Sequence, residues 1–433
     1  MNQVPLNPFI PHQPVKPDEF VGRSAEIFDL EQCLSHAKNG TPRHFLLTGD
    51  RGIGKTSLMD YLRSVGRSVS SDQKVNFDFL VADIILDKYT TTLEFIRKIE
   101  RAISRELEKT EPARAFLSKA WEFLNRVEAV GVSVRSSPTE VRSDTMLRVE
   151  LAHSLINISN RVCQKSDYRS DVISKQYDGI LIIVDEADQA PKDLALGAFL
   201  KTFLETLHRE RCTSVMFGLT GLPTAVDRLL EGHRSSLRLF HQVRLGCLRK
   251  IEVIDIIDQK VLDIRNQGVS KFDITDAAKE VIWMYSDGHP HFVQQLGYCA
   301  FEAALNSVRD SAVNYDREFP MDFCVQAEHV HQGALHREGA IQIMGDIYFE
   351  AVFRRLSKSN EKLLILRQLV ESDGFELPRS EIKCLPETND VDNELLDLCD
   401  SGLIIEDRLT DCYKIRYASF AYWLSTNTPG IVP

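Results

Sequence analysis

The stretch that decides the fold is GDRGIGKTS, residues 49–57, which directly follows the short apolar run HFLLT at His44–Thr48. Glycines at this spacing let the backbone curl so that several N–H groups point at one anion. A helix beginning near Lys55 would add the positive end of its dipole. The pattern GxxxxGK[ST] between a strand and a helix therefore indicates a phosphate-binding P-loop.

Each residue type in this loop suits one part of a nucleoside triphosphate. The amine of Lys55 is expected to reach the β- and γ-phosphates, and the hydroxyl of Thr56 to bind Mg²⁺. ATP with Mg²⁺ is the expected ligand. Asp50 and Arg51 are expected to be solvated or to face another subunit. The residues expected to surround the phosphates are Gly49, Asp50, Arg51, Gly52, Ile53, Gly54, Lys55, Thr56 and Ser57.

A second motif, ILIIVDEAD at Ile180–Asp188, is an apolar strand that ends in acidic residues, which is the Walker B pattern. Asp185 is expected to hold Mg²⁺ through water, and Glu186 to orient or deprotonate the attacking water. On this motif alone, an exposed acidic turn after a core strand is the alternative. Together with the P-loop, the motif predicts slow hydrolysis of ATP to ADP and phosphate.

Short apolar strands alternate with helical stretches as far as residue 249, which predicts a parallel α/β sheet with helices on both faces. From residue 250 the pattern becomes helical, and residues 346–425 have the order of a winged helix: three helices and a hairpin. Strands are expected at 44–48, 77–85, 179–185, 214–220 and 242–245, and a small hairpin at 129–135. Helices are expected at 92–108, 113–127, 146–163, 194–209, 250–267, 275–286 and 290–308.

These elements divide the 433 residues into several domains, as a chain of this length leads one to expect. The predicted parts are an extended proline-rich arm at 1–19, an α/β ATPase core at 20–249 with an insert at about 86–176, a helical lid at 250–308, an irregular linker at 309–345 and a winged helix at 346–433.

Composition is that of an ordinary globular protein, with 43% hydrophobic and 27% charged residues and a net charge of −11. No run approaches the ~18 apolar residues of a membrane span, and the N-terminal stretch lacks the apolar segment of a secretory signal. The nine cysteines are scattered singly, which favours reduced thiols in the cytoplasm. The acidic balance argues against a generally nucleic-acid-binding surface.

Phe20-Val21-Gly22-Arg23, upstream of the P-loop, resembles a box found in two groups of ATPases. These are the replication-initiator (origin-recognition) AAA+ ATPases and the STAND ATPases, including the MNS-type archaeal and bacterial proteins. The resemblance implies that this box lies beside the nucleotide base. It also implies that Thr220 acts as sensor 1, and that Pro290, in a lid motif at Gly288–Phe292, closes over the base.

One departure from the replication initiators is that the lid segment GHPHFVQQLGYCA carries no sensor 2 arginine. Its Gly-x-Pro resembles STAND proteins more closely. Arg238, with Leu245 and Leu248, is similar to a segment that both groups carry before the lid.

Five arginines lie close together near the end of the expected core: Arg228, Arg234, Arg238, Arg244 and Arg249. One of them could reach the γ-phosphate of a neighbouring subunit as an arginine finger. Arg238 is the first candidate by position and Arg234 the second. The alternative is a solvated basic face. An arginine finger would imply an ATP-dependent homo-oligomer.

The expected winged helix is acidic, since residues 357–433 hold eight Lys or Arg and fourteen Asp or Glu. Its expected recognition helix, about 388–401, carries five carboxylates and no basic residue. Phosphate neutralisation supplies most non-specific DNA affinity, so this domain is expected to contact protein rather than DNA. DNA contact by the insert or by the arginines stays open.

The leading hypothesis is an ATP-binding and ATP-hydrolysing molecular switch that controls a protein partner or effector in prokaryotic defence or signalling. The alternatives are a DNA-transaction ATPase resembling replication or transposition initiators, and a nucleotide-locked scaffold with little turnover. A DEAD-type helicase is disfavoured because no second α/β motor domain follows Thr220.

Overall fold

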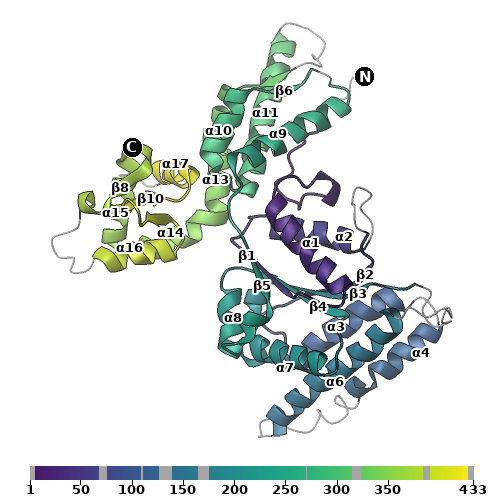
Figure 1. Ribbon diagram of the computed structural model, residues 1–433. Coiled ribbons are helices and arrows are strands. Elements are labelled where there is room, and N and C mark those ends of the chain that lie inside the picture. Colours follow the sequence, from purple (N-terminus) through teal and green to yellow (C-terminus); the bar gives the residue numbers. More distant parts are fainter. Residues whose placement is uncertain are drawn as a thin grey trace. The chain divides into compact units, whose positions relative to one another are not determined.

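The computed structural model describes residues 5–67, 76–108, 111–125, 139–163, 175–269, 271–314, 323–383 and 391–427. The chain divides into two compact units, one formed by Val15–Gly246 and the other by Met1–Pro14 together with Cys247–Pro433. Each unit has a hydrophobic interior of its own (Figure 1). Within the described ranges, none of the helices has the length and hydrophobicity needed to cross a bilayer.

The unit Val15–Gly246 is built on a five-stranded parallel sheet with the strand order β2-β3-β4-β1-β5. The predicted parallel α/β core is thus confirmed. The order reverses at β1, which has β4 on one side and β5 on the other, and ligands of such sheets bind at the carboxyl ends of the strands at this point. The strands are β1 (Phe45–Gly49), β2 (Phe79–Ile85), β3 (Gly179–Asp185), β4 (Val215–Gly221) and β5 (His241–Leu245).

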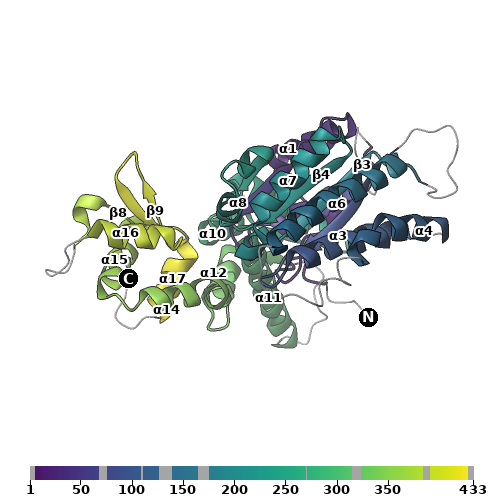
Figure 2. The same ribbon diagram turned by 90° about the horizontal axis from the view of Figure 1, so that it is seen from below.

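Helices cover both faces of this sheet, as Figures 1 and 2 show. One face packs against α1 (Ser24–Lys38) and α2 (Lys55–Gly66). Side chains alternate between the faces, so Leu47 lies in the core on this side and Leu46 in the core on the other. The helices of the second face are α3 (Thr92–Leu107), α4 (Glu111–Ala120), α6 (Thr139–Cys163) and α7 (Leu196–Arg209).

The expected insert at 86–176 supplies part of this second helical layer. Ile99 of α3 and Leu155 of α6 are fully buried in the same core as the sheet residue Ile182. The helix expected at 113–127 is interrupted, because α4 ends at Ala120 and Trp121 forms a turn. The hairpin expected at 129–135 lies outside the described residues.

The second unit begins with helices, as expected, but its helical part extends further than predicted. The stretch expected to be an irregular linker contains the end of α11 and all of α12. Gly333 lets α12 approach α11 closely, because a Cβ there would lie 2.6 Å from the carbonyl oxygen of Cys299. The elements are α9 (Lys250–Asn266), α10 (Asp276–Ser286), α11 (Pro290–Asn314), α12 (Ala327–Leu335), α13 (Ala340–Met344), and a short parallel pair, β6 (Asp273–Ile274) with β7 (Cys324–Val325).

The C-terminal part has the winged-helix order of helices followed by a hairpin, as expected. Two elements were not predicted: β8, which completes an antiparallel sheet of order β8-β10-β9, and α17, whose Phe420 and Leu424 are fully buried. The elements are α14 (Glu350–Leu356), α15 (Asn360–Glu371), β8 (Glu376–Pro378), α16 (Val391–Asp400), β9 (Ile404–Asp407), β10 (Cys412–Ile415) and α17 (Ala418–Asn427).

The N-terminal segment is docked rather than merely extended. The ring of Phe9 is 1% exposed and lies over Gly297 of α11, where a Cβ would come within 2.4 Å of it. The amide of Asn7 donates to the carbonyl of Tyr298 at 3.1 Å and to the carboxylate of Glu302 at 3.0 Å. Residues up to Pro14 therefore complete the core of the second unit.

Candidate functional site

The P-loop joins β1 to α2, and two of its glycines have conformations that other residues rarely adopt. Gly52 and Gly54 have φ values of 74° and 95°. Apart from its chain neighbours, no atom of the described residues lies within 4 Å of the position that a Cβ of Gly54 would take, so this loop borders open space. Gly49 serves packing instead, because a Cβ there would lie 2.7 Å from the Cγ2 of Ile53. The result is an open cradle of backbone N–H groups, suited to an anion.

Lys55 folds back over this cradle. Its Nζ donates to the carbonyl oxygens of Gly49 and Asp50, each at 2.9 Å. Burial lowers the pKa of Lys55, and the carboxylate of Asp188 is the strongest of the charges that oppose this shift, ahead of Asp185. The ammonium group is thus held inside the loop, between the backbone and the acidic end of β3.

The two hydroxyl residues after Lys55 have different surroundings. Thr56 is exposed at the first turn of α2. Ser57 is buried, and its Oγ accepts a hydrogen bond from the backbone N–H of Val15 at 3.2 Å. Thr56 therefore has the accessible hydroxyl that a metal ligand needs, whereas Ser57 fastens the chain that leads into this unit.

The Walker B residues lie at the carboxyl end of β3. Asp185 ends the strand, and its Oδ1 accepts the N–H of Glu186 at 2.8 Å. Glu186 is exposed and has a left-handed backbone, with φ 55° and ψ 41°. Such a conformation is costly for a residue with a Cβ, and strain of this kind is concentrated at functional sites.

Thr220 is completely buried near the end of β4, opposite Leu47 of β1. Its Oγ1 has no hydrogen-bond partner within the described part of the chain. A buried hydroxyl without a partner is costly in a structural position, which fits a residue that responds to a ligand.

Asp188 is the site residue that the sequence did not identify as functional. It lies in the 3-10 turn η2 (Ala187–Gln189), is 8% exposed, and its Oδ1 accepts the N–H of Leu222 at 2.8 Å. It thus connects the turn after Walker B to the loop after β4. The only signal in the sequence was the third acidic position of the DEAD tetrapeptide.

The Phe20–Arg23 box contacts the P-loop through protein atoms. Phe20 stacks on Tyr61 of α2, with ring centroids 5.8 Å apart. Arg23 is 4% exposed, and its Nη2 donates to the carbonyl oxygen of Ile53 at 3.0 Å. Gly22 and Arg23 both have positive φ. The structure therefore brings this box beside the phosphate loop.

The remaining candidates belong to other elements of the chain. Arg234 and Arg238 are exposed, Arg238 within the 3-10 turn η4 (Ser236–Leu239), and neither has a side-chain partner among the described residues. Arg228, by contrast, pairs with Glu231 at 3.1 Å. Pro290 begins α11 in the second compact unit.

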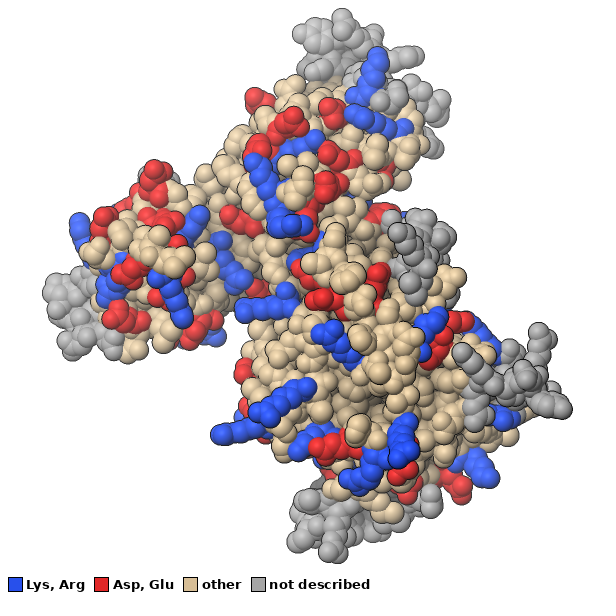
Figure 3. Space-filling view, in the orientation of Figure 1, with Lys and Arg blue, Asp and Glu red and all other residues tan. Residues whose placement is uncertain are grey.

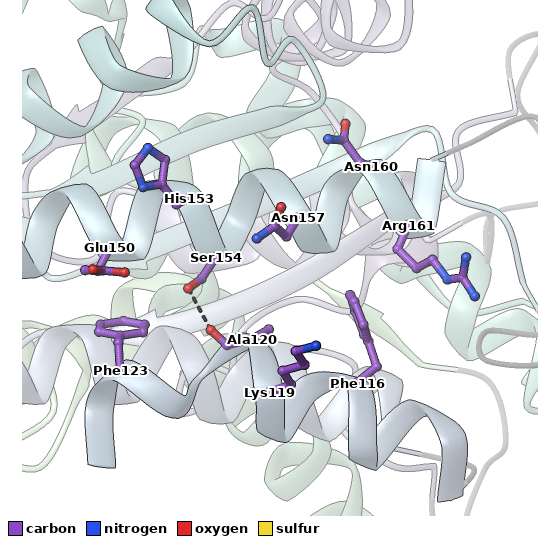
Figure 4. A pocket seen from close by; sticks show the side chains of 10 residues that line it. All are labelled: Phe116, Lys119, Ala120, Phe123, Glu150, His153, Ser154, Asn157, Asn160 and Arg161. Atoms are coloured by element: carbon purple, nitrogen blue, oxygen red, sulfur yellow. Dashed lines mark hydrogen bonds between the residues drawn. The ribbon is translucent and has the colours of Figure 1, made fainter. Parts of the chain in front are cut away.

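A separate cavity of about 550 Å³ lies between α4 and α6 (Figure 4). Its lining includes Phe116, Phe123, Lys119 and Arg161. Ser154 also lines it and donates to the carbonyl of Ala120 at 2.7 Å, which joins α6 to α4. This cavity lacks the convergent backbone donors and paired carboxylates of the P-loop region, so the candidate catalytic site is the P-loop.

One family model covers the stretch that carries the P-loop and the Walker B motif. Residues 19–217 match the family model of the AAA ATPase domain. The chain resembles the P-loop AAA+ ATPases. This match supports ATP binding and ATPase activity for the chain in general. Among curated protein sequences, none matches it.

Solved structures resemble the chain at low sequence identity. ORC2 of Aeropyrum pernix, solved as ADPNP–ADP complexes, has a TM-score of 0.54 and 13% identity over 95% of both chains. A Walker-type ATPase of Pyrococcus abyssi has a TM-score of 0.48 and 18% identity, over 95% of this chain and 98% of that one. A point variant of RuvB from Thermotoga maritima has a TM-score of 0.39 and 14% identity, over 96% of this chain and 99% of that one.

Proposed function

We propose that the chain is an ATP-hydrolysing molecular switch that controls a protein partner or effector, in prokaryotic defence or signalling. The observation that carries this proposal is the connection between Walker B and the loop after β4, made by Asp188 and Leu222. Phosphate contacts at Lys55 would therefore bias the positions of the Walker B turn and of the loop after β4. A nucleotide shifts a conformational equilibrium only through such differential contacts.

Mg²⁺ fits the residues present. Thr56 offers an exposed hydroxyl and Asp185 a carboxylate at the strand end, which are the oxygen ligands this ion prefers. When bound, the ion would neutralise charge on the phosphates. Lys55 would bind the phosphates themselves, and the exposed carboxylate of Glu186 would orient the attacking water.

A protein partner is favoured over DNA because of α16. Asp392, Asp397 and Asp400 are exposed on this helix, which has no basic residue. On the face drawn in Figure 3, acidic and basic side chains are interspersed over the lobe formed by α14 to α17. A helix with this charge would be repelled by phosphates in a DNA groove.

A DNA-transaction ATPase is the second candidate. The fold shared with ORC2 and the exposed Arg234 and Arg238 favour it, although a shared fold does not by itself transfer function. Binding of duplex DNA measured at several salt concentrations separates the two candidates. Affinity that falls steeply with salt, and that Arg234→Ala with Arg238→Ala removes, would support the second.

Hydrogen exchange measured without nucleotide, with ADP and with ATP tests the switch. Glu186→Gln should stay loaded with ATP, and its exchange around residues 220–222 should differ from that of the ADP state. Lys55→Ala is the control that should show no nucleotide effect. Identical exchange in ATP and ADP would reject the switch. Equal turnover by wild type and Glu186→Gln would instead favour the nucleotide-locked scaffold.

A further inference from the structure

Asp188 uses both carboxylate oxygens within the protein. Its Oδ1 accepts from the backbone N–H of Leu222 at 2.8 Å, and its Oδ2 accepts from the side-chain amide of Gln189 at 2.7 Å. At 8% exposure it is almost closed off from solvent. A carboxylate whose oxygens are both engaged in this way is poorly placed to bind a metal ion, so its role differs from those of Asp185 and Glu186.

The loop that Asp188 holds is shaped around it. A Cβ at Gly221 would lie 2.7 Å from the Oδ1 of Asp188 and 3.1 Å from the Cβ of Ala225. Only glycine therefore fits without moving the carboxylate or the loop. Gly221 pairs with Thr48 at the end of β1, directly before the P-loop. The contact thus lies between the strand that carries Thr220 and the turn that carries the Walker B acids.

The contact also lies close to the P-loop along the sheet. Asp188 bonds to Leu222, which directly follows Gly221, and Gly221 pairs with Thr48, one residue before the P-loop begins at Gly49. The carboxylate is therefore connected to the end of the strand from which the P-loop starts.

We propose that Asp188 is a positioning residue that holds Thr220 and Leu222 in register with the Walker B turn. Through this contact, phosphate bound at Lys55 changes the loop after β4. This inference rests on the proposed function, since it names the connection by which the same site would transmit its nucleotide state.

The test compares Asp188→Asn, Asp188→Ala and Gly221→Ala with wild type. Asn keeps an oxygen that can accept from Leu222, Ala removes it, and Gly221→Ala displaces the same contact from the opposite side. Asp193→Asn is a matched control, because Asp193 is exposed five residues further along the chain. The measurements are hydrogen exchange at residues 220–222 with and without ATP, the Kd of a fluorescent ATP analogue, and kcat.

In wild type and Asp193→Asn, the amide of Leu222 should be protected, and its exchange should change when ATP binds. In Asp188→Ala and Gly221→Ala that protection should fall, and kcat should decrease by about 10–100-fold, as for other residues that orient a catalytic group. The Kd should stay within about threefold, because the P-loop itself is unchanged. Asp188→Asn should recover most of the protection, because its side-chain oxygen still accepts the hydrogen bond from Leu222. If the negative charge alone mattered, Asp188→Asn would lose the protection as Asp188→Ala does.

Two results would overturn the inference. One is protection of Leu222 in Asp188→Ala equal to that of wild type. The other is loss of the bond between Asp188 and Leu222 in a variant whose kcat, and whose change in hydrogen exchange on ATP binding, equal those of wild type. If Asp188→Ala does not fold, Gly221→Ala gives the same reading, and Asp188→Asn serves as its comparison. Failure of wild type to bind ATP would reject the proposed function, whereas the exchange of Leu222 would still report on Asp188.

Discussion

Glu186 combines an exposed carboxylate with a left-handed backbone. We expect the backbone strain to lower the stability of the protein and the carboxylate to support its activity. Glu186→Gly should relieve the strain and raise the free energy of unfolding by up to about 1 kcal/mol, while removing the group that orients water. Glu186→Gln should leave stability unchanged and lower turnover by about 10²–10⁴-fold. Urea unfolding and phosphate release measure the two effects. A glycine variant less stable than wild type would contradict the strain argument.

His44 gives the core a defined acid sensitivity. Its Nδ1 accepts the N–H of Phe217 at 3.1 Å, and burial lowers its pKa to about 4. The unfolded chain, with an ordinary pKa near 6.5, binds the proton more readily. Stability therefore falls as the pH drops from about 6.5 towards 4, by about 2 kcal/mol at pH 5.

His44→Gln keeps an acceptor for Phe217 and cannot be protonated in this range. Its unfolding free energy should decrease less than that of wild type between pH 7.5 and pH 5. Urea titrations at both pH values measure this, with His36→Gln as an exposed control. Equal losses in wild type and His44→Gln would show that another group causes the acid sensitivity.

At this scale, the sequence predicted the positions of the motif residues but not the hydrogen bonds that hold them in place. The motif spacing predicted that Lys55 begins a helix, that Asp185 ends a strand and that Glu186 follows it, and the structure has them at these places. The bonds of Asp188 to Leu222 and of Arg23 to Ile53 join residues 34 and 30 positions apart. Such pairs depend on which strand ends lie side by side, and local sequence does not contain that information.

Among the elements, α17 depends on a residue of another helix. The carboxylate of Asp287, just after α10, accepts the N–H of Ala418 at the start of α17, at 2.6 Å. Asp287 has a φ of 46°, and burial raises its pKa. Asp287→Ala should lower the free energy of unfolding by about 1 kcal/mol, since it removes a helix cap.

Asp287→Asn should cost less than the alanine variant. Asparagine keeps the acceptor, tolerates the left-handed backbone and avoids burying a charge. Thermal and urea unfolding of the two variants measure the difference. If alanine and asparagine are equally destabilising, the capping bond contributes little.

Strands were easier to predict than the later helices. The strands β1, β3 and β4 are mostly apolar runs bounded by loop residues, so composition marks them, whereas β5 (HQVRL) is mostly polar. The helix α12 contains Gly333, which lowers helix propensity but is needed for close contact with α11. The helix α17 is rich in aromatic residues with modest helix propensity, and packing of Phe420 and Trp423 stabilises it instead.

At the scale of the whole molecule, the exposed arginines predict self-association that depends on ATP. With a non-hydrolysable ATP analogue, mass measurements should detect a species larger than the monomer. Arg238→Ala should reduce its amount, and Arg234→Ala should do so less, because an arginine finger adds contacts to the γ-phosphate of a neighbour. Arg209→Ala, at an exposed position of α7, is the control. A monomeric mass with and without the analogue would exclude a finger.

The docking of Phe9 on Gly297 has a consequence for the order of events during synthesis. Phe9 leaves the ribosome long before α11, which begins at Pro290, exists. The whole of Val15–Gly246 is translated in between, and domains generally fold as units while the chain grows. The aromatic ring therefore lacks its α11 contact while Val15–Gly246 folds. The contact of this early residue is among the last that the growing chain can make.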